Sequence, residues 1–215
     1  MRLASLFLLC LSACGPLAQN FPDASTFSDE NPNPSTPSPE EAIALQRHDL
    51  NGDGLADIAV GASGYPVNNV IRGAVQLYWG SKTGSAFITG QILVYPGTDA
   101  SALFGESIAY LGDTNGDGYS DLAVGAQHSD ATGIDTGIVY IYLGSKEGVV
   151  DPPARTLNFP GTQNLAYFGS NVSAAGDVNQ DGYQDLLISA KRANLKGSVF
   201  LYLGGPTGIQ STPHK

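Results

Sequence analysis

Short apolar stretches that end in glycine recur along the chain. The clearest reads GIVYIYLG at residues 137–144, and similar stretches occupy 73–80 and 197–204. Aromatic and β-branched residues bounded by glycine are typical of β-strands. No stretch shows sustained helical periodicity. The pattern therefore predicts an all-β chain.

The middle repeat divides into four predicted strands, at 105–112, 121–126, 137–144 and 155–159. The connections between them are rich in Gly, Pro, Asp and Ser, which favour turns. Four-stranded antiparallel units repeated along a chain indicate blades of a β-propeller. We therefore predict tandem four-stranded antiparallel blades over 41–215, only about three in number, as a partial or open propeller. Their approximate bounds are 41–103, 104–167 and 168–215.

A polar loop of the form D-x-N-x-D-G-x-x-D precedes the second strand of each repeat. The three copies begin at Asp49, Asp113 and Asp177, 64 residues apart. Positions 1, 3, 5 and 9 supply side-chain oxygens, and position 7 supplies a backbone carbonyl. Glycine at position 6 permits a sharp bend that turns alternate residues inward.

These loops offer oxygen ligands only, which suits Ca²⁺ rather than zinc or copper. Mg²⁺ is disfavoured because it retains its waters. The loops are not EF-hands, since position 12 is Val60, Val124 or Ile188 instead of Glu, and we expect the position-9 carboxylate to close each site. We predict about three Ca²⁺ sites. Their ligands would be Asp49, Asn51, Asp53, the carbonyl of Leu55 and Asp57; Asp113, Asn115, Asp117, the carbonyl of Tyr119 and Asp121; Asp177, Asn179, Asp181, the carbonyl of Tyr183 and Asp185.

The acidic balance of the chain agrees with this interpretation. The formal net charge is −10, and nine of the 20 acidic residues lie in the three loops. Clustered carboxylates repel one another, and three divalent ions would supply six positive charges. The alternative is three Asp- and Asn-rich surface turns that hold no metal. The negative charge also argues against nucleic acid as a partner.

The combination of motifs resembles the FG-GAP repeat, the blade motif of integrin α-subunit propellers and of many bacterial surface proteins. Phe104-Gly105 and Phe168-Gly169 each precede an acidic loop and a short strand with small residues. The first copy departs from the pattern, with Glu40-Glu41 where Phe-Gly would fall. The resemblance implies Ca²⁺ in the loop between the first and second strands of each blade. It also implies that Phe104 and Phe168 belong to the core.

A closed propeller has four to eight blades, whereas this chain provides about three. The third blade also lacks a convincing outer strand. Three interpretations remain: a truncated product or fragment of a longer gene, which we favour; an oligomer that completes a ring; and an open stack of blades with exposed strand edges.

The N-terminus predicts a lipoprotein signal peptide at 1–13. A short basic start and an apolar core precede Leu11-Ser12-Ala13-Cys14-Gly15, which resembles a bacterial lipobox with Cys14 as the lipidated residue. An ordinary cleaved secretory signal is the alternative. Residues 14–40 would comprise the lipidated cysteine and a Pro-, Ser- and Asn-rich tether. We expect a bacterial cell-envelope location, anchored to the membrane through lipid at the outer membrane or the cell surface.

The sequence favours binding over catalysis. No nucleophile elbow, zinc-protease motif or phosphate-binding loop occurs, and His48, beside Asp49, fits a solvent-exposed loop better than a general base. We expect a calcium-binding surface lipoprotein that acts in adhesion or in binding a protein or glycan, with self-association to complete the propeller as one option. The alternatives are a structural envelope protein without a specific ligand, and a fragment or subunit of a hydrolase. Variable loops at 62–72 and 127–136 are where specificity would lie.

Overall fold

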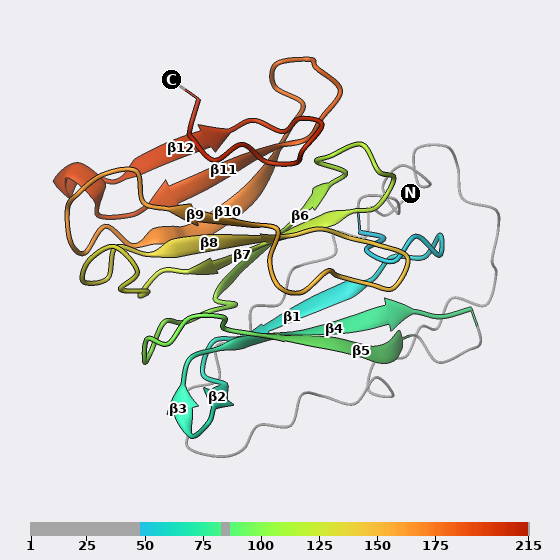
Figure 1. The fold of residues 1–215 in the computed structure, drawn as a ribbon, viewed down its shortest axis with the longest axis horizontal. Coiled ribbons are helices and arrows are strands. Elements are labelled where there is room, and N and C mark those ends of the chain that lie inside the picture. Colours follow the sequence, from blue (N-terminus) through green and yellow to red (C-terminus); the bar gives the residue numbers. More distant parts are fainter. Residues whose placement is uncertain (1–47, 83–86, 215) are drawn as a thin grey trace, which may run out of the picture.

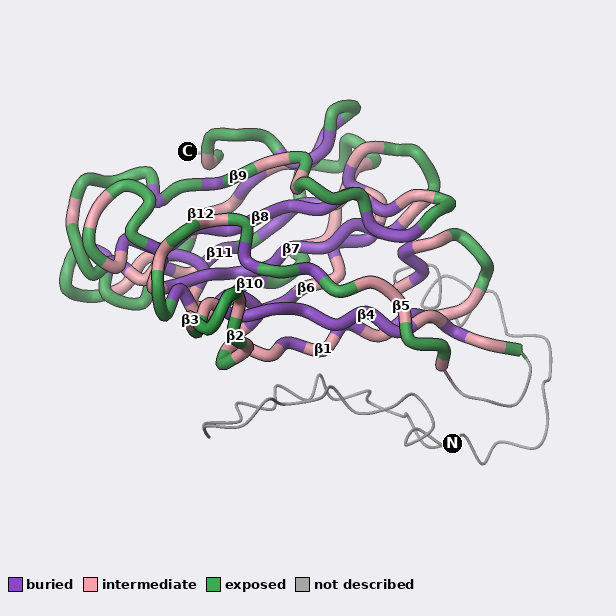
Figure 2. Tube along the Cα trace, turned by 60° about the horizontal axis from the view of Figure 1, so that its bottom comes forward, coloured by how far each residue is buried: buried purple, intermediate pink, exposed green. Residues whose placement is uncertain are grey.

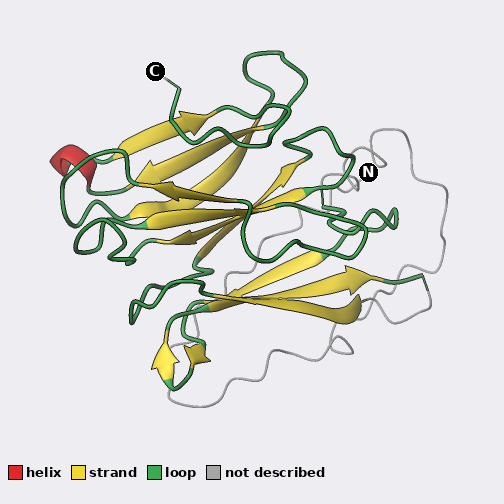
Figure 3. Ribbon diagram, in the orientation of Figure 1, coloured by secondary structure: helices red, strands yellow, loops and turns green. Residues whose placement is uncertain are grey.

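The computed structural model describes residues 48–82 and 87–214, and these residues form β-strands joined by loops (Figures 1 and 3). One short 3₁₀ turn, Ala193–Leu195, lies between two of the strands. The predicted all-β class is confirmed. The signal peptide, Cys14 and the tether lie outside the described residues.

Apart from a two-stranded hairpin, the described strands form three antiparallel sheets that lie side by side, which we call blades 1, 2 and 3 (Figure 1). Blade 2 has the complete order β6-β7-β8-β9, and the sequence placed its four strands correctly. Among the described residues, blade 1 consists of β1-β4-β5 and blade 3 of β10-β11-β12. The arrangement is that of a partial, open β-propeller. The bounds are β1 (Ile58–Ala62), β4 (Ala74–Gly80) and β5 (Phe87–Val94); β6 (Ser107–Gly112), β7 (Asp121–Ala126), β8 (Ile138–Tyr142) and β9 (Arg155–Asn158); β10 (Phe168–Gly176), β11 (Asp185–Ala190) and β12 (Ser198–Tyr202).

The segment 62–72 differs from the expected open loop. It contains a small hairpin of β2 (Pro66–Val67) and β3 (Val70–Ile71). The hairpin turns at Asn68 and Asn69, whose φ angles are 54° and 62°. Asparagine tolerates the left-handed backbone that a two-residue hairpin turn requires. The Asn68-Asn69 pair is therefore the sequence signal for this hairpin, and the prediction of a plain loop did not use it.

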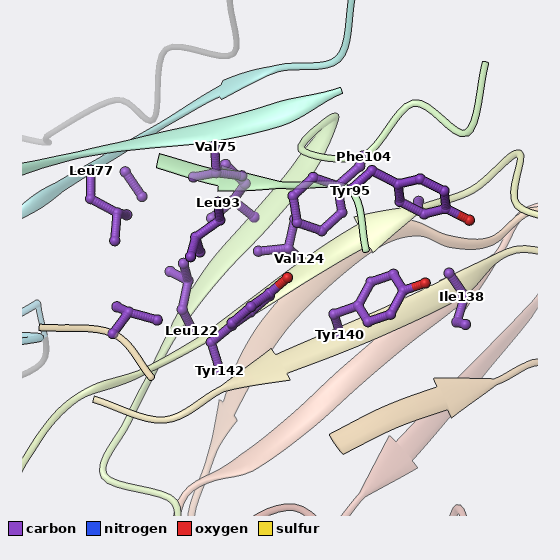
Figure 4. Close-up of a cluster of buried hydrophobic side chains, with 14 of the residues drawn as sticks. Val75, Leu77, Leu93, Tyr95, Phe104, Leu122, Val124, Ile138, Tyr140 and Tyr142 are labelled. Atoms are coloured by element: carbon purple, nitrogen blue, oxygen red, sulfur yellow. The ribbon is translucent and has the colours of Figure 1, made fainter. Parts of the chain in front are cut away.

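Blade 2 contributes side chains to two hydrophobic cores because its strands are buried on both faces (Figure 2). Leu122 and Val124 of β7 pack with Val75 and Leu77 of blade 1, a cluster that Figure 4 shows together with Tyr142. The second core lies between blades 2 and 3. Its members include Ala123, Val139, Ile141, Leu157, Phe159, Phe168, Leu186, Ile188 and Tyr202.

Phe104 and Phe168 are fully buried, so the predicted core role of both is confirmed. Each lies at a junction between blades: Phe104 forms an isolated bridge with Gly73, and Phe168 forms one with Gly137. Ring contacts extend each phenylalanine into the core, since Phe168 lies 6.2 Å from the ring centroid of Tyr202.

A second pair of glycines allows adjacent blades to approach closely. A Cβ atom built on Gly61 would lie 1.9 Å from the carbonyl oxygen of Gly105, and one on Gly125 would lie 2.3 Å from that of Gly169. Neither distance is tolerable, so only glycine fits at these two positions. The equivalent position of blade 3 holds Ser189.

His48 is not the solvent-exposed loop residue that the sequence suggested. Its ring is half-buried and meets the ring of Tyr110 edge-on, with 4.6 Å between the ring centroids. The contact joins the residue that precedes the first acidic loop to β6 of blade 2. The two residues are far apart in the sequence, so the sequence alone does not reveal this contact. None of the helical segments described is long and apolar enough to cross a membrane.

Candidate metal centres

The acidic loops lie at one edge of the three sheets, at the ends opposite the β2–β3 hairpin and the 3₁₀ turn (Figure 1). The first, 49–57, leads into β1. The second, 113–121, connects β6 to β7, and the third, 177–185, connects β10 to β11. The predicted placement between the first and second strands is confirmed for blades 2 and 3. For blade 1 the preceding segment lies outside the described residues.

The position-1 carboxylate organises each loop by accepting hydrogen bonds from the loop's own backbone. Oδ1 of Asp113 accepts from the N–H groups of Gly116 at 2.6 Å and Asp117 at 3.1 Å, and Oδ2 accepts from Gly118 at 2.8 Å. Asp49 accepts from the three corresponding amides. These bonds wrap the backbone around one carboxylate, which is possible because positions 4 and 6 have left-handed φ angles.

The side chains at positions 3 and 5 accept hydrogen bonds from backbone amides of their own loop. Oδ1 of Asn115 accepts from the backbone N–H of Asp117 at 3.0 Å, and Oδ1 of Asp117 accepts from that of Tyr119 at 3.0 Å. The amide group of Asn115 also donates to Oδ2 of Asp117 at 2.8 Å. The third loop repeats this pattern at Asn179 and Asp181.

The position-9 aspartate has a structural role that sequence reasoning missed. Oδ2 of Asp121 accepts from the backbone N–H and the hydroxyl of Thr114, and Oδ1 accepts from the N–H of Gly144 at 3.0 Å. Gly144 follows the third strand of the blade, so Asp121 ties the loop to the sheet. Asp57 and Asp185 make the equivalent bonds in blades 1 and 3.

These buried aspartates carry an electrostatic cost. Burial raises the pKa of Asp57 from its ordinary value of 3.8 to about 6, although backbone hydrogen bonds oppose the shift. The carboxylates of Asp49 and Asp53 raise that pKa further by repulsion. Burial likewise raises the pKa of Asp121 to about 6, with Asp117 as the repelling neighbour. A cation among these groups would relieve the repulsion.

The donor set fits a hard cation by its chemistry. Within residues 48–82 and 87–214, no three His, Cys, Asp or Glu side chains are already gathered about one point. Each predicted ligand set nevertheless combines three carboxylates with an amide oxygen and a backbone carbonyl, which is oxygen ligation of the kind that Ca²⁺ accepts. In the first loop the carboxylates of Asp49 and Asp53 each raise the pKa of Asp57 by repulsion. The residues therefore fit Ca²⁺, and their assignment as ligands stays a prediction.

Comparison with known proteins finds the same repeats. The profile of the FG-GAP-like repeat matches residues 49–124, and that of the FG-GAP repeat matches residues 168–202. Integrin alpha-PS3 of Drosophila melanogaster is 36% identical over 163 residues, and mouse integrin alpha-IIb is 37% identical over 151 residues. These matches cover 74% and 68% of this chain but 14% of each integrin. The chain thus spans about one seventh of the length of these relatives.

Proposed function

Because the chain belongs to the FG-GAP repeat family, with propeller blades similar to those of integrin α-subunits, we propose that it is a calcium-binding protein of the cell surface that acts in adhesion or binding. The support for binding rather than catalysis is the family together with the all-β architecture. Ca²⁺ would occupy the three acidic loops and hold their edge of the sheets in order.

The observation that carries the calcium proposal is the organisation of the loops. In each loop the position-1 carboxylate accepts hydrogen bonds from backbone amides, and the side-chain oxygen of position 3 accepts one from the amide of position 5. In loops 1 and 2 the buried position-9 aspartate has a raised pKa of about 6. A divalent ion offsets the charge that burial penalises.

Melting the protein with and without Ca²⁺ tests this proposal. We expect chelation to lower Tm, because an ion that binds only the folded state stabilises it by mass action. Mg²⁺ at the same concentration is the matched control and should stabilise the protein less, since Mg²⁺ resists losing its waters. Equal Tm values with Ca²⁺ and with chelator would contradict the proposal.

The partner is proposed to be a protein or a glycan. The support is the family alone, since the relatives are integrin α-subunits and this chain covers a small part of each. Immobilised protein with Ca²⁺ would be probed with an array of glycans and with isolated envelope proteins. Retention that disappears on chelation supports calcium-dependent binding. Absence of any retained glycan or protein would favour a purely structural envelope role.

Attachment through lipid at Cys14 completes the proposal. Cys14 lies outside the described residues, so the support is the lipobox-like sequence alone. The full-length protein and its Cys14→Ser variant would be expressed in a bacterial host, and their membrane fractions compared. Lipidation predicts that the variant moves to the soluble fraction, whereas equal membrane retention would argue for another form of attachment.

A further inference from the structure

The acidic loops of neighbouring blades contact one another directly. The backbone N–H of Ser120, in loop 2, donates to the carbonyl oxygen of Asp49, in loop 1, at 3.0 Å. The N–H of Ser145, in blade 2, donates to the carbonyl of Leu50 at 3.1 Å. Blade 3 makes the equivalent bond to loop 2, in which the N–H of Gly205 donates to the carbonyl of Thr114 at 3.2 Å.

An aromatic ring strengthens each contact. The ring of Tyr119, at position 7 of loop 2, lies against Gly52, at position 4 of loop 1. A Cβ atom built on Gly52 would lie only 2.5 Å from Cε1 of this ring. The ring of Tyr183, in loop 3, lies against Gly116 in loop 2, with a corresponding distance of 3.1 Å. Tyr119 and Tyr183 thus place their rings against the preceding loop, while their carbonyls are the predicted ligands of their own loops.

The third loop shows that glycine at position 4 serves the ring and not only the backbone. Position 4 of loop 3 is Gln180, which adopts the same left-handed conformation, with φ of 60° against 73° for Gly52 and 81° for Gly116. Gln180 is exposed, whereas the equivalent glycines Gly52 and Gly116 lie against the rings of Tyr119 and Tyr183. A side chain is therefore tolerated by the loop itself, and glycine occurs where a neighbour's tyrosine packs.

We propose that neighbouring loops take up Ca²⁺ cooperatively, and that Tyr119 and Tyr183 act as positioning residues that link loop 2 to loop 1 and loop 3 to loop 2. An ion fixes the backbone of its own loop, including positions 4 and 7. That order is transmitted through the packed ring, so the next ion has less conformational entropy to remove. This inference rests on the proposed calcium function.

Substitution at position 4 tests the link with a residue that the protein already uses there. Gly116→Gln places the side chain of loop 3 in loop 2, where it displaces the ring of Tyr183. Gln180→Gly is the matched control, because it makes the reverse change at the exposed equivalent position of loop 3. Tyr183→Leu is a second variant that removes the ring and leaves Gly116 intact.

Each loop has its own reporter, the backbone amide of its position-6 glycine, which bonds to the position-1 carboxylate. These amides belong to Gly54, Gly118 and Gly182. Titration of the folded protein with Ca²⁺, followed by ¹H–¹⁵N spectra, gives an affinity for each loop separately. Asp181→Asn, which weakens loop 3, provides the second arm of a double-mutant cycle.

Coupling predicts that Asp181→Asn lowers the Ca²⁺ affinity of loop 2 by at least about 5-fold, the lower end of typical coupling between sites. When Gly116→Gln or Tyr183→Leu is already present, Asp181→Asn should leave the Ca²⁺ affinity of loop 2 unchanged. In the Gln180→Gly protein, Asp181→Asn should still lower that affinity. If loop 2 ignores Asp181→Asn in the otherwise unaltered protein, the loops are independent and the coupling is overturned while the calcium function stands. If no glycine amide responds to Ca²⁺, both proposals fail.

Discussion

At the scale of single residues, the aspartates of one loop perform different work. Asp121 is fully buried and accepts hydrogen bonds from groups on both sides of the loop, whereas Asp117 is exposed. From sequence spacing, both were predicted as ligands of one ion, with Asp121 closing the site. The partner of Asp121 at the end of β8 lies 23 residues away, so only the fold could reveal the difference.

Alanine substitutions should separate these two roles. Asp121→Ala leaves the buried N–H groups of Thr114 and Gly144 without acceptors, and we expect the free energy of unfolding to fall by about 2–4 kcal/mol even without Ca²⁺. Asp117→Ala should cost much less without Ca²⁺ and yet weaken Ca²⁺ binding. Chemical denaturation with and without Ca²⁺ measures both effects. Equal losses in calcium-free buffer would contradict the assignment.

The raised pKa values of Asp57 and Asp121 predict an unusual response to pH. Their folded pKa of about 6 exceeds the ordinary 3.8. Protonation therefore favours the calcium-free fold; this contribution is complete below pH 3.8 and is lost as pH rises through about 6. Lowering pH from 7.5 to 5.5 without Ca²⁺ should stabilise the fold by about 1.5 kcal/mol from the two groups together, or roughly 3–6 °C in Tm.

Saturating Ca²⁺ should reverse that response, because protons then compete with the ion for the carboxylates. Thermal melts across this pH range, in calcium-free and calcium-saturated buffers, provide the comparison. Asp121→Asn supplies the control, since it removes one of the two titrating groups and should reduce the calcium-free response. A calcium-free Tm that falls steadily toward pH 5.5 would count against the assignment.

At the scale of elements, the strands flanking the acidic loops were predictable and the contacts between blades were not. The run 121–126 is apolar and short, so its identity as a buried strand followed from composition. Within this run, Gly125 and Ala126 looked like generic small residues. Their function emerged only when Gly125 proved to lie against the carbonyl of the next Phe-Gly turn.

Gly125→Ala is expected to weaken the junction between blades 2 and 3. Gly125 is absent from the residues with left-handed φ, so alanine adds no backbone strain, but its Cβ would collide with the hydroxyl of Ser107 and the carbonyl oxygen of Gly169. Overpacking of this kind costs about 1–3 kcal/mol in unfolding free energy. Ser189→Ala is the matched control at the same position of blade 3 and should change stability little. Urea denaturation of both variants would decide the matter.

At the scale of the whole molecule, blade 2 holds the structure together because it is shared by both cores. Leu122 and Val124 pack toward blade 1, while Ala123 and Val139 pack toward blade 3. A closed ring would give every blade two such neighbours. In the described part of this chain only blade 2 has a neighbouring blade on both sides. The sequence predicted the number of blades but not which blade would be buried on both faces.

Hydrogen exchange should reflect this arrangement. Amides of β7 and β8, buried throughout, should exchange most slowly, and those of β5 and β12, whose residues are largely half-buried or exposed, should exchange faster. Mass spectrometry of peptides from each blade, in saturating Ca²⁺, measures the difference. Protection of β12 equal to that of β7 would indicate that another surface covers blade 3 in solution.

Ser189 has a consequence for how such genes grow. Each junction between two blades combines a glycine of one repeat with the Phe-Gly pair of the following repeat. A DNA segment that preserves a junction therefore runs from the middle of one repeat to the middle of the next. A duplication that placed the third repeat in the second position would bring a serine side chain against a carbonyl oxygen. Lengthening by duplication would therefore cost less stability with DNA encoding the second repeat than with DNA encoding the third, unless codon 189 first changed to a glycine codon.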